Sequence, residues 1–275
     1  MDEEYLLLLL ADSNLPTGSF VASSGIESYL KHGFSSSSPE STIVAFITDS
    51  LASYARSTLP FVSDAHHLVA LAREQSRGEG ELNQVLKDLM ELDHLYNSMT
   101  LNHVARRASK AQGVALLTLY AKGFARSSSL SAFTDSEPHH HETAMNRLFS
   151  QFKLSVRKEE VDGHLPTCWG ALTAALGLAL DRAQYLHLFL HARSLLSASV
   201  RLNVIGPYSA QQILLHVLRP LITAEAERCH ELRTGLFQTK GTGFNVTIQG
   251  PANTWPLGEI LASRHDLQHS RIFNS

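Results

Sequence analysis

Apolar residues recur at intervals of three and four along most of the chain, which is the spacing of one face of an α-helix. The pattern is clearest in five segments: Ile43 to Leu59, Leu82 to Leu95, Val104 to Leu119, Tyr185 to Leu196 and Ile213 to Ile222. The alternation that marks a strand is limited to one short candidate, Phe244 to Ile248. We therefore predict an all-α protein, a bundle of roughly eight to ten helices at the usual length of about 11–12 residues each.

Turn and cap residues divide these helices. Ser24 with Glu27 three residues later has the form of a capping box that opens a helix, and Gly33 suits the end of that helix. Pro220 lies inside an otherwise helical pattern, where its ring and missing N–H should kink or end the helix. These residues predict where helices begin and end.

The chain contains no internal repeat and no clear domain boundary, so we expect residues 1–275 to form a single domain. A Ser-rich segment near 127–141 predicts a mobile loop, and residues 264–275 predict a C-terminal tail. Residues 165–180 combine apolar side chains with Ala and Gly at helical spacing, which favours a tightly packed central helix over a dimer interface.

Composition places the chain among ordinary globular proteins, with 44% hydrophobic and 18% charged residues. The net charge of -3, without a cluster of Lys and Arg, excludes an electrostatic surface for nucleic acid or an anionic membrane. Cys168 and Cys229 are too few for a disulfide framework, which fits a cytoplasmic protein. The apolar runs end well short of the ~20 residues that span a bilayer.

The usual signatures of enzymes are missing from the sequence. It contains no Gly-x-Ser-x-Gly elbow, no phosphate-binding Walker loop and no His-Glu-x-x-His helix. Gly241-Thr242-Gly243 lacks a preceding strand and a following apolar helix, so we interpret it as a turn. We predict no catalytic residue and no cofactor.

Histidines offer a possible metal site. His187 and His191 lie four residues apart on a predicted helix and could share a metal ion, but with Gln184 and Ser194 they form a polar stripe typical of a solvated or partner-facing surface. The tract His139 to His141 could bind nickel or zinc weakly. We favour the structural interpretation of both groups and predict no metal site, with nickel binding as the alternative.

Three separated blocks and the tail resemble the urease accessory protein UreF family. The first block is Leu9-Leu10-Ala11-Asp12-Ser13-Asn14-Leu15-Pro16-Thr17-Gly18-Ser19-Phe20 followed by Ser23-Ser24-Gly25-Ile26-Glu27. The second joins Asn102, Arg106-Arg107-Ala108-Ser109 and Gln112-Gly113, and the third runs from Ser199 through Arg201 and Gly206-Pro207 to Gln211-Gln212. The tail contributes Arg264-His265-Asp266 and Ser270-Arg271-Ile272-Phe273. The blocks occur in the family's order across essentially the whole chain.

This resemblance implies an all-α, dimeric adaptor without a reaction of its own. Proteins of this family bind the accessory protein UreD, also called UreH, and recruit the GTPase UreG to the urease apoprotein for nickel insertion. The alternative is a direct nickel metallochaperone that uses surface histidines.

The blocks also supply candidate site residues. Arg201 could cap carbonyls at a helix end or offer its guanidinium to a partner's carboxylate, and Glu27 could serve the capping box or a partner. Candidate partner-binding residues are Glu27, Arg201, Gln211, Arg264, His265, Arg271 and Phe273. Candidate turn-forming residues are Pro16, Gly18 and Gly25.

Overall fold

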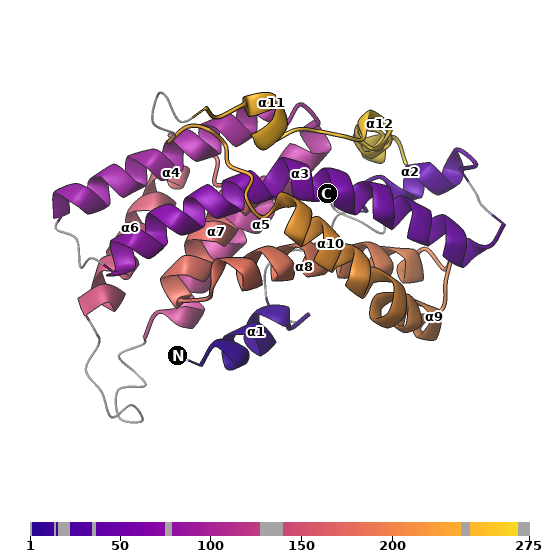
Figure 1. Ribbon diagram of the computed structural model, residues 1–275, viewed down its shortest axis with the longest axis horizontal. Helices are drawn as coiled ribbons and strands as arrows, with labels where there is room; N and C mark the ends of the chain where they lie inside the picture. Colours follow the sequence, from indigo (N-terminus) through magenta and orange to yellow (C-terminus); the bar gives the residue numbers. More distant parts are fainter. Residues whose placement is uncertain are drawn as a thin grey trace. The chain divides into compact units, whose positions relative to one another are not determined.

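The computed structural model describes residues 2–13, 15, 23–34, 37–74, 79–126, 140–237 and 243–268 (Figure 1). Within these ranges every regular element is a helix and no strand forms. Nine of the α-helices there have seven residues or more, which confirms the all-α prediction. None of the described helices has the length and apolar character needed to cross a membrane.

The elements follow one another along the chain with few long connections. The α-helices are α1 (Glu3–Ala11), α2 (Ile26–Lys31), α3 (Pro39–Glu74), α4 (Glu79–Met99), α5 (His103–Leu119), α6 (His140–Arg157), α7 (Leu165–Leu176), α8 (Leu180–Arg201), α9 (Pro207–Gln212), α10 (Arg219–Cys229), α11 (Val246–Gln249) and α12 (Pro256–Ser263). The π-helical turns are Tyr120–Phe124 and Ile213–Leu218, and a 3-10 turn covers His265–Leu267. The five segments of helical periodicity all lie within these elements.

Two local features differ from the sequence patterns. The short strand candidate at Phe244 to Ile248 forms no strand, because Asn245 caps α11 by accepting a hydrogen bond from the Thr247 N–H at 3.0 Å. The capping box is also absent: α2 begins after Gly25, and no side chain caps its first turn. Gly33 does lie just beyond the end of α2, as predicted, with φ of 76°.

The two internal prolines of long helical patterns behave differently. Pro220 lies in the first turn of α10, directly after a π-helical turn, so the helix changes geometry there as predicted. Pro60 lies inside α3, which continues without a break to Glu74. Because Pro60 has no N–H, the Arg56 carbonyl loses its usual helical donor, and the Ala252 N–H donates to it at 3.4 Å instead.

The helices form two compact units. Unit 1 contains Met1–Thr17, Phe61–Met99 and Ser109–Ala183, and unit 2 contains Gly18–Pro60, Thr100–Ala108 and Gln184–Ser275. The single domain expected from the sequence stays a prediction.

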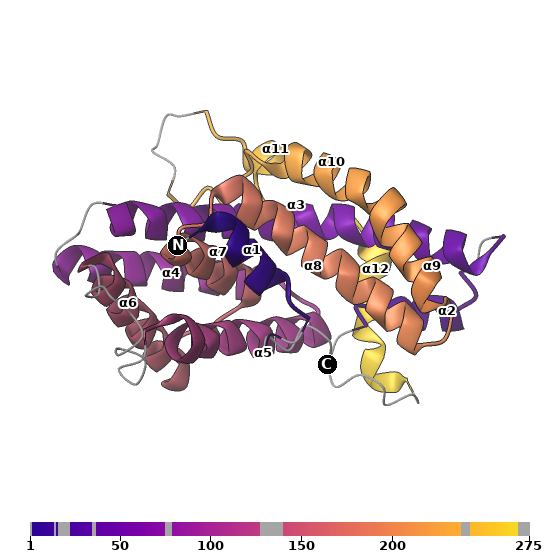
Figure 2. The ribbon, with the colours of Figure 1, turned by 90° about the horizontal axis from the view of Figure 1, so that it is seen from below.

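Helix α7 is the centre of unit 1, as the small residues predict. Its residues from Pro166 to Ala175 are buried without exception. A Cβ atom added at Gly170 would overlap the carbonyl oxygen of Val62 on α3, so the two helices touch backbone to backbone. Around this pair, α4 packs against α6 (Figure 1, Figure 2).

Unit 2 has an aromatic centre that links α2, α3 and the start of α12. The ring of Phe46 meets those of Tyr29 and Trp255 edge to face, with centroids 5.0 and 5.2 Å away. Such edge-to-face pairs add about 0.5–1.5 kcal/mol each to the burial of the rings. The aromatic centre therefore fixes the C-terminal helix against two elements that come more than 200 residues earlier.

Candidate functional site

The blocks of family resemblance are far apart in sequence, yet parts of them meet in unit 2. We call residues 256–268, which comprise α12 and the 3-10 turn, the C-terminal arm. The arm packs on α2, which belongs to the first block, and bonds to the start of α5, which belongs to the second. Each contact can be traced to particular residues.

Gly25 permits the close approach of the arm to α2. Its φ is 90°, in the left-handed region that glycine adopts without strain. A Cβ atom added there would lie 2.9 Å from the backbone nitrogen of Ala262 in α12. Any other residue at this position would therefore force α2 and the arm apart.

Asp266 anchors the far end of the arm. Its carboxylate accepts hydrogen bonds from Arg107 Nη2 at 2.7 Å and Arg107 Nη1 at 3.3 Å, and it lies 3.1 Å from His103 Nε2. The hydrogen bonds from Arg107, and then the one with His103, hold the pKa of Asp266 below its usual value. The carboxylate thus joins the tail to the first turn of α5.

Asn102 makes a second connection between the arm and α5. Its side-chain oxygen accepts the N–H groups of Val104 and Ala105, which caps α5, and its amide nitrogen donates to the Glu259 carbonyl at 3.0 Å. One buried side chain therefore starts α5 and positions α12.

Two predicted partner-binding residues, Glu27 of α2 and His265 of the arm, are buried. Glu27 is 3% exposed and its carboxylate lies 3.4 Å from Lys31 Nζ. His265 is 9% exposed, with Nδ1 3.5 Å from the Ser23 hydroxyl. Neighbouring Arg264, in contrast, is exposed. Burial gives Glu27 and His265 a direct part in the packing of this region.

Apolar side chains nevertheless remain exposed around the arm. Ile260 is 61% exposed and Leu267 is 67% exposed, while Leu101, next to the capping Asn102, is 84% exposed. We call these three residues, with Leu257 and Arg264, the arm surface. Several exposed apolar side chains on neighbouring segments favour a surface that binds another protein.

Comparison with known proteins shows the family of the chain. The sequence profile of the UreF family matches residues 38–218. The chain is 42% identical to urease accessory protein 6 of Cryptococcus neoformans, over 99% of this chain and 97% of that protein. The chain belongs to the UreF family. Its members are urease accessory proteins without a catalytic reaction of their own.

Similarity extends to distant members of the UreF family. The chain is 27% identical to urease accessory protein F of Oryza sativa subsp. japonica, over 96% of this chain and 82% of that protein. It is 25% identical to urease accessory protein UreF of Corynebacterium efficiens, over 97% of this chain and 94% of that protein. The likeness therefore covers nearly the whole length of the chain.

The UreF-family residues Arg201 and Gln211 lie apart from the contacts of the arm. Arg201 is the last residue of α8 and is exposed, with Nη2 3.4 Å from the Ser197 hydroxyl. Gln211 is exposed on α9, where Tyr208 is 87% exposed. Pro16, Gly18, Arg271 and Phe273 lie outside the described residues, as do His139 and the side chain of His140.

The interpretation of His187 and His191 as part of a solvated or partner-facing stripe was wrong. Both rings stack on Tyr54 of α3, with centroids 5.0 and 3.9 Å away, and His191 Nε2 lies 3.0 Å from the Ser50 hydroxyl. Burial, and then the neighbouring His191, lowers the pKa of His187 to about 3, and burial lowers the pKa of His191 to about 3. The two imidazoles are therefore neutral packing groups at physiological pH.

Gln184 of the same stripe is also buried. It is 1% exposed, and its side-chain oxygen lies 3.0 Å from His230 Nδ1. Gln184, His187 and His191 thus make their contacts inside unit 2. The sequence pattern showed their shared face but could not identify Tyr54, on which the two histidines stack.

A further group in unit 1 has the residue types of a metal site but a structural role. Atoms of Asp93, Asp162 and His164 lie within 4.8 Å of one another. The Asp93 carboxylate accepts the backbone N–H groups of Asp162 and Gly163 at 2.9 Å and of His164 at 2.6 Å. These bonds fold the turn before α7.

The other ligand atoms of this group also have partners. Asp162 Oδ1 lies 2.5 Å from Lys110 Nζ, and both ring nitrogens of His164 lie 3.2 Å from side-chain oxygens of Ser109 and Asn97. A metal ion would have to displace these bonds. The group has no signature in the sequence, because Asp93 lies about 70 residues before Asp162 and His164 and metal-site motifs have much shorter spacings.

Proposed function

We propose that this UreF-family protein is the non-catalytic adaptor of urease maturation. In this proposal it acts in the cytoplasm as a homodimer, binds a UreD/UreH-like accessory protein, and recruits a UreG-like GTPase to the urease apoprotein for nickel insertion. The family supports the accessory role, and the arm surface supports an adaptor that works by protein contact.

The observation that carries the proposal is the anchored, exposed arm surface. Four contacts hold the arm on the rest of unit 2. They are the close packing of Gly25 on Ala262, the hydrogen bond from Asn102 to Glu259, the hydrogen bonds from Arg107 to Asp266, and the ring contact of Trp255 with Phe46. A fixed segment loses little conformational entropy when a partner binds, so it binds more tightly than a loose tail would. Its apolar side chains lie outside this anchored layer and are available to a partner.

The predicted contact residues divide accordingly. We assign direct contact to the arm surface and to the continuing tail with Arg271 and Phe273, and we assign a positioning role to the buried Glu27 and His265. Arg201 and Gln211, exposed at the end of α8 and on α9, form a second contact region. A planar guanidinium such as that of Arg201 suits a carboxylate on the partner.

Co-purification with a tagged UreD-like protein tests the proposal. Ile260→Asp with Leu267→Asp places charges on the arm surface and should abolish co-purification, as should deletion of residues 265 to 275. Leu154→Asp is the matched control, because Leu154 is a 49% exposed leucine on α6 in unit 1. Retained binding by both arm variants, with unchanged melting temperatures, would show that the arm surface is not the contact.

The direct nickel-carrier alternative has less support. His187 and His191 stack on Tyr54, so nickel binding would depend on the tract His139 to His141. Of this tract, the structure describes the backbone of His140 and the whole of His141.

A further inference from the structure

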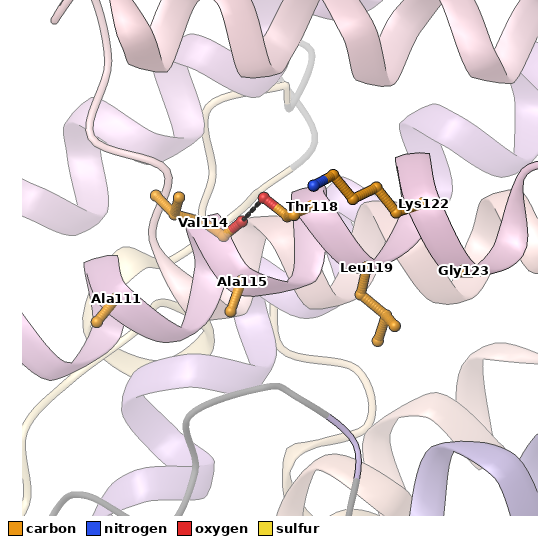
Figure 3. Close-up of a pocket in the computed structure, with 7 residues that line it drawn as sticks. All are labelled: Ala111, Val114, Ala115, Thr118, Leu119, Lys122 and Gly123. Atoms are coloured by element: carbon orange, nitrogen blue, oxygen red, sulfur yellow. Dashed lines mark hydrogen bonds between the residues drawn. The ribbon is translucent and has the colours of Figure 1, made fainter.

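An apolar groove runs along the part of α5 that belongs to unit 1. It has a volume of about 510 Å³ and is lined by Ala111, Val114, Ala115, Thr118, Leu119, Lys122 and Gly123 (Figure 3). These residues follow α5 into the π-helical turn, a stretch of roughly 18 Å at the helical rise of about 1.5 Å per residue. Alanine and glycine hollow the groove, and Leu119 forms its apolar end.

Positive charge gathers at the same end. Lys122 lines the groove, and Lys153 and Arg157 lie four residues apart on α6. The pKa of Lys153 is lowered mainly by burial and then by the positive charges of Arg157 and Lys122. The three cations therefore lie close enough to repel one another. None of the three forms an ion pair in the part of the chain that the structure describes, whereas nearby Lys110 and Arg126 do. The groove therefore has an unneutralised basic end.

Helix α1 of the same unit has the opposite character. Leu6 and Leu10 are buried, but Tyr5 is 57% exposed and Leu8, three residues later, is 72% exposed, so they form an apolar face. In Figure 2, α1 lies in front of α7. No residue of α1 lines the groove. Its exposed apolar face is thus not used within the chain's own groove.

The first turn of α1 is acidic. Asp2 caps the helix, and Glu3 and Glu4 follow. Asp2 and Glu4 are exposed, and neither forms an ion pair among the described residues. A helix of nine residues is roughly 13 Å long, which fits within the length of the groove.

We propose that the groove on α5 is the docking site for α1 of a second copy of this chain. Tyr5 and Leu8 pack over Ala115 and Leu119, and Asp2 and Glu4 face Lys122, Lys153 and Arg157. This arrangement makes α1 antiparallel to the partner's α5, so the positive end of one helix dipole meets the negative end of the other. Each copy offers one helix and one groove, so a two-fold axis generates two identical contacts.

The proposal rests on the homodimer of the proposed function and specifies its interface. Two contacts by one short helix bury little area compared with a standard interface of about 1,600 Å², so the dimer should dissociate on dilution. The charges at the groove end then determine much of its stability.

Charge exchange tests the interface by sedimentation velocity across protein concentrations. Lys122→Glu with Lys153→Glu reverses the groove, and Asp2→Lys with Glu4→Lys reverses the helix. Each double variant alone should raise the dimer dissociation constant about tenfold or more, because like charges then face each other. An equimolar mixture should recover the dimer, because both contacts in a mixed pair are again complementary. Lys87→Glu, at an exposed lysine of α4, is the control.

Three results would overturn the proposal, provided that circular dichroism shows folded variants. Unmodified protein that is monomeric would contradict both the homodimer and this interface. Dimers that persist in both double variants would contradict the interface and leave the homodimer intact. Groove variants that stay dimeric but lose a UreD-like partner would assign the groove to that partner.

Discussion

Asp266 shows how one residue joins two segments that lie about 160 residues apart in the sequence. The carboxylate is 45% exposed, yet it accepts two hydrogen bonds from the Arg107 guanidinium and one contact from His103. A bidentate pair has defined geometry, so it fixes orientation even where solvent weakens its energy. The function of Asp266 in the fold is to hold the arm in register on α5.

Replacement of Asp266 by Asn should release the end of the arm with a small loss of stability. We expect about 0.2–1 kcal/mol, the range for exposed ion pairs. The measurement is the free energy of unfolding in urea, with hydrogen exchange of the Leu267 and Gln268 amides as the local signal. Asp88→Asn on α4 is the control, since its hydrogen bond with Gln84 survives the change.

The same pair predicts a pH dependence. The pKa of Asp266 is lowered in the folded state, so its contribution is complete above the unfolded value of about 3.9 and is lost as the pH falls through the lowered folded value. The difference between the natural chain and Asp266→Asn should therefore shrink below about pH 4. A difference that does not change between pH 3 and 6 would contradict this account.

His187 and His191 also make stability fall on acidification, but over a higher pH range than Asp266. Both have a folded pKa of about 3, below the unfolded value of about 6.5. The unfolded chain thus gains protons first, and stability falls as the pH drops from about 6.5 toward 3. From pH 7 to pH 5 we expect a loss of up to about 2 kcal/mol per histidine in urea unfolding. Replacement of both by Phe, which preserves ring stacking on Tyr54, should flatten this dependence; an equally steep loss would contradict it.

At the scale of elements, the contact between α3 and α7 depends on the absence of a side chain. Gly170 lies where a Cβ atom would overlap the backbone of Val62 and come within 3.0 Å of the Ala65 Cβ. Gly170→Ala should destabilise unit 1 by about 1–3 kcal/mol, because two helix backbones must separate.

Gly80→Ala on α4 is the matched control for this prediction. A Cβ atom there has no neighbour within 4 Å. Alanine favours a helix by about 1 kcal/mol over glycine at an open position, so this change should be neutral or stabilising. Thermal unfolding compares the two variants, and equal effects would mean that helix propensity, not close packing, determines the result.

Element prediction succeeded where periodicity was long and failed where a single local bond decided the outcome. The small and apolar residues of α7 predicted a buried central helix, because ten consecutive residues all suit a buried position. The segment at Phe244 to Ile248 is too short for periodicity to distinguish strand from helix, and the cap from Asn245 decides it. In α3, the contact of Ala252 with Arg56 compensates for Pro60 from 192 residues away in sequence.

At the scale of the molecule, the two proposed contact surfaces belong to different units. Unit 2 contains the arm and the exposed Arg201 and Gln211, whereas unit 1 contains the groove on α5 and the acidic helix α1. An adaptor that brings several proteins together needs more than one surface. The arm and groove variants can be tested independently, because the arm substitutions all lie in unit 2 and the groove and α1 substitutions all lie in unit 1.

The sequence by itself determined the all-α class, the buried character of α7, the end of α2 at Gly33 and the UreF family, because these depend on periodic patterns and on ordered motifs. Only the tertiary structure showed that Gly25 and Asn102 contact the arm that Asp266 anchors, that Glu27 is buried, and that His187 and His191 stack on Tyr54. These facts depend on which distant segments pack together. A helical pattern predicts that one face of a helix is buried, but which segment covers that face is decided only when the chain folds.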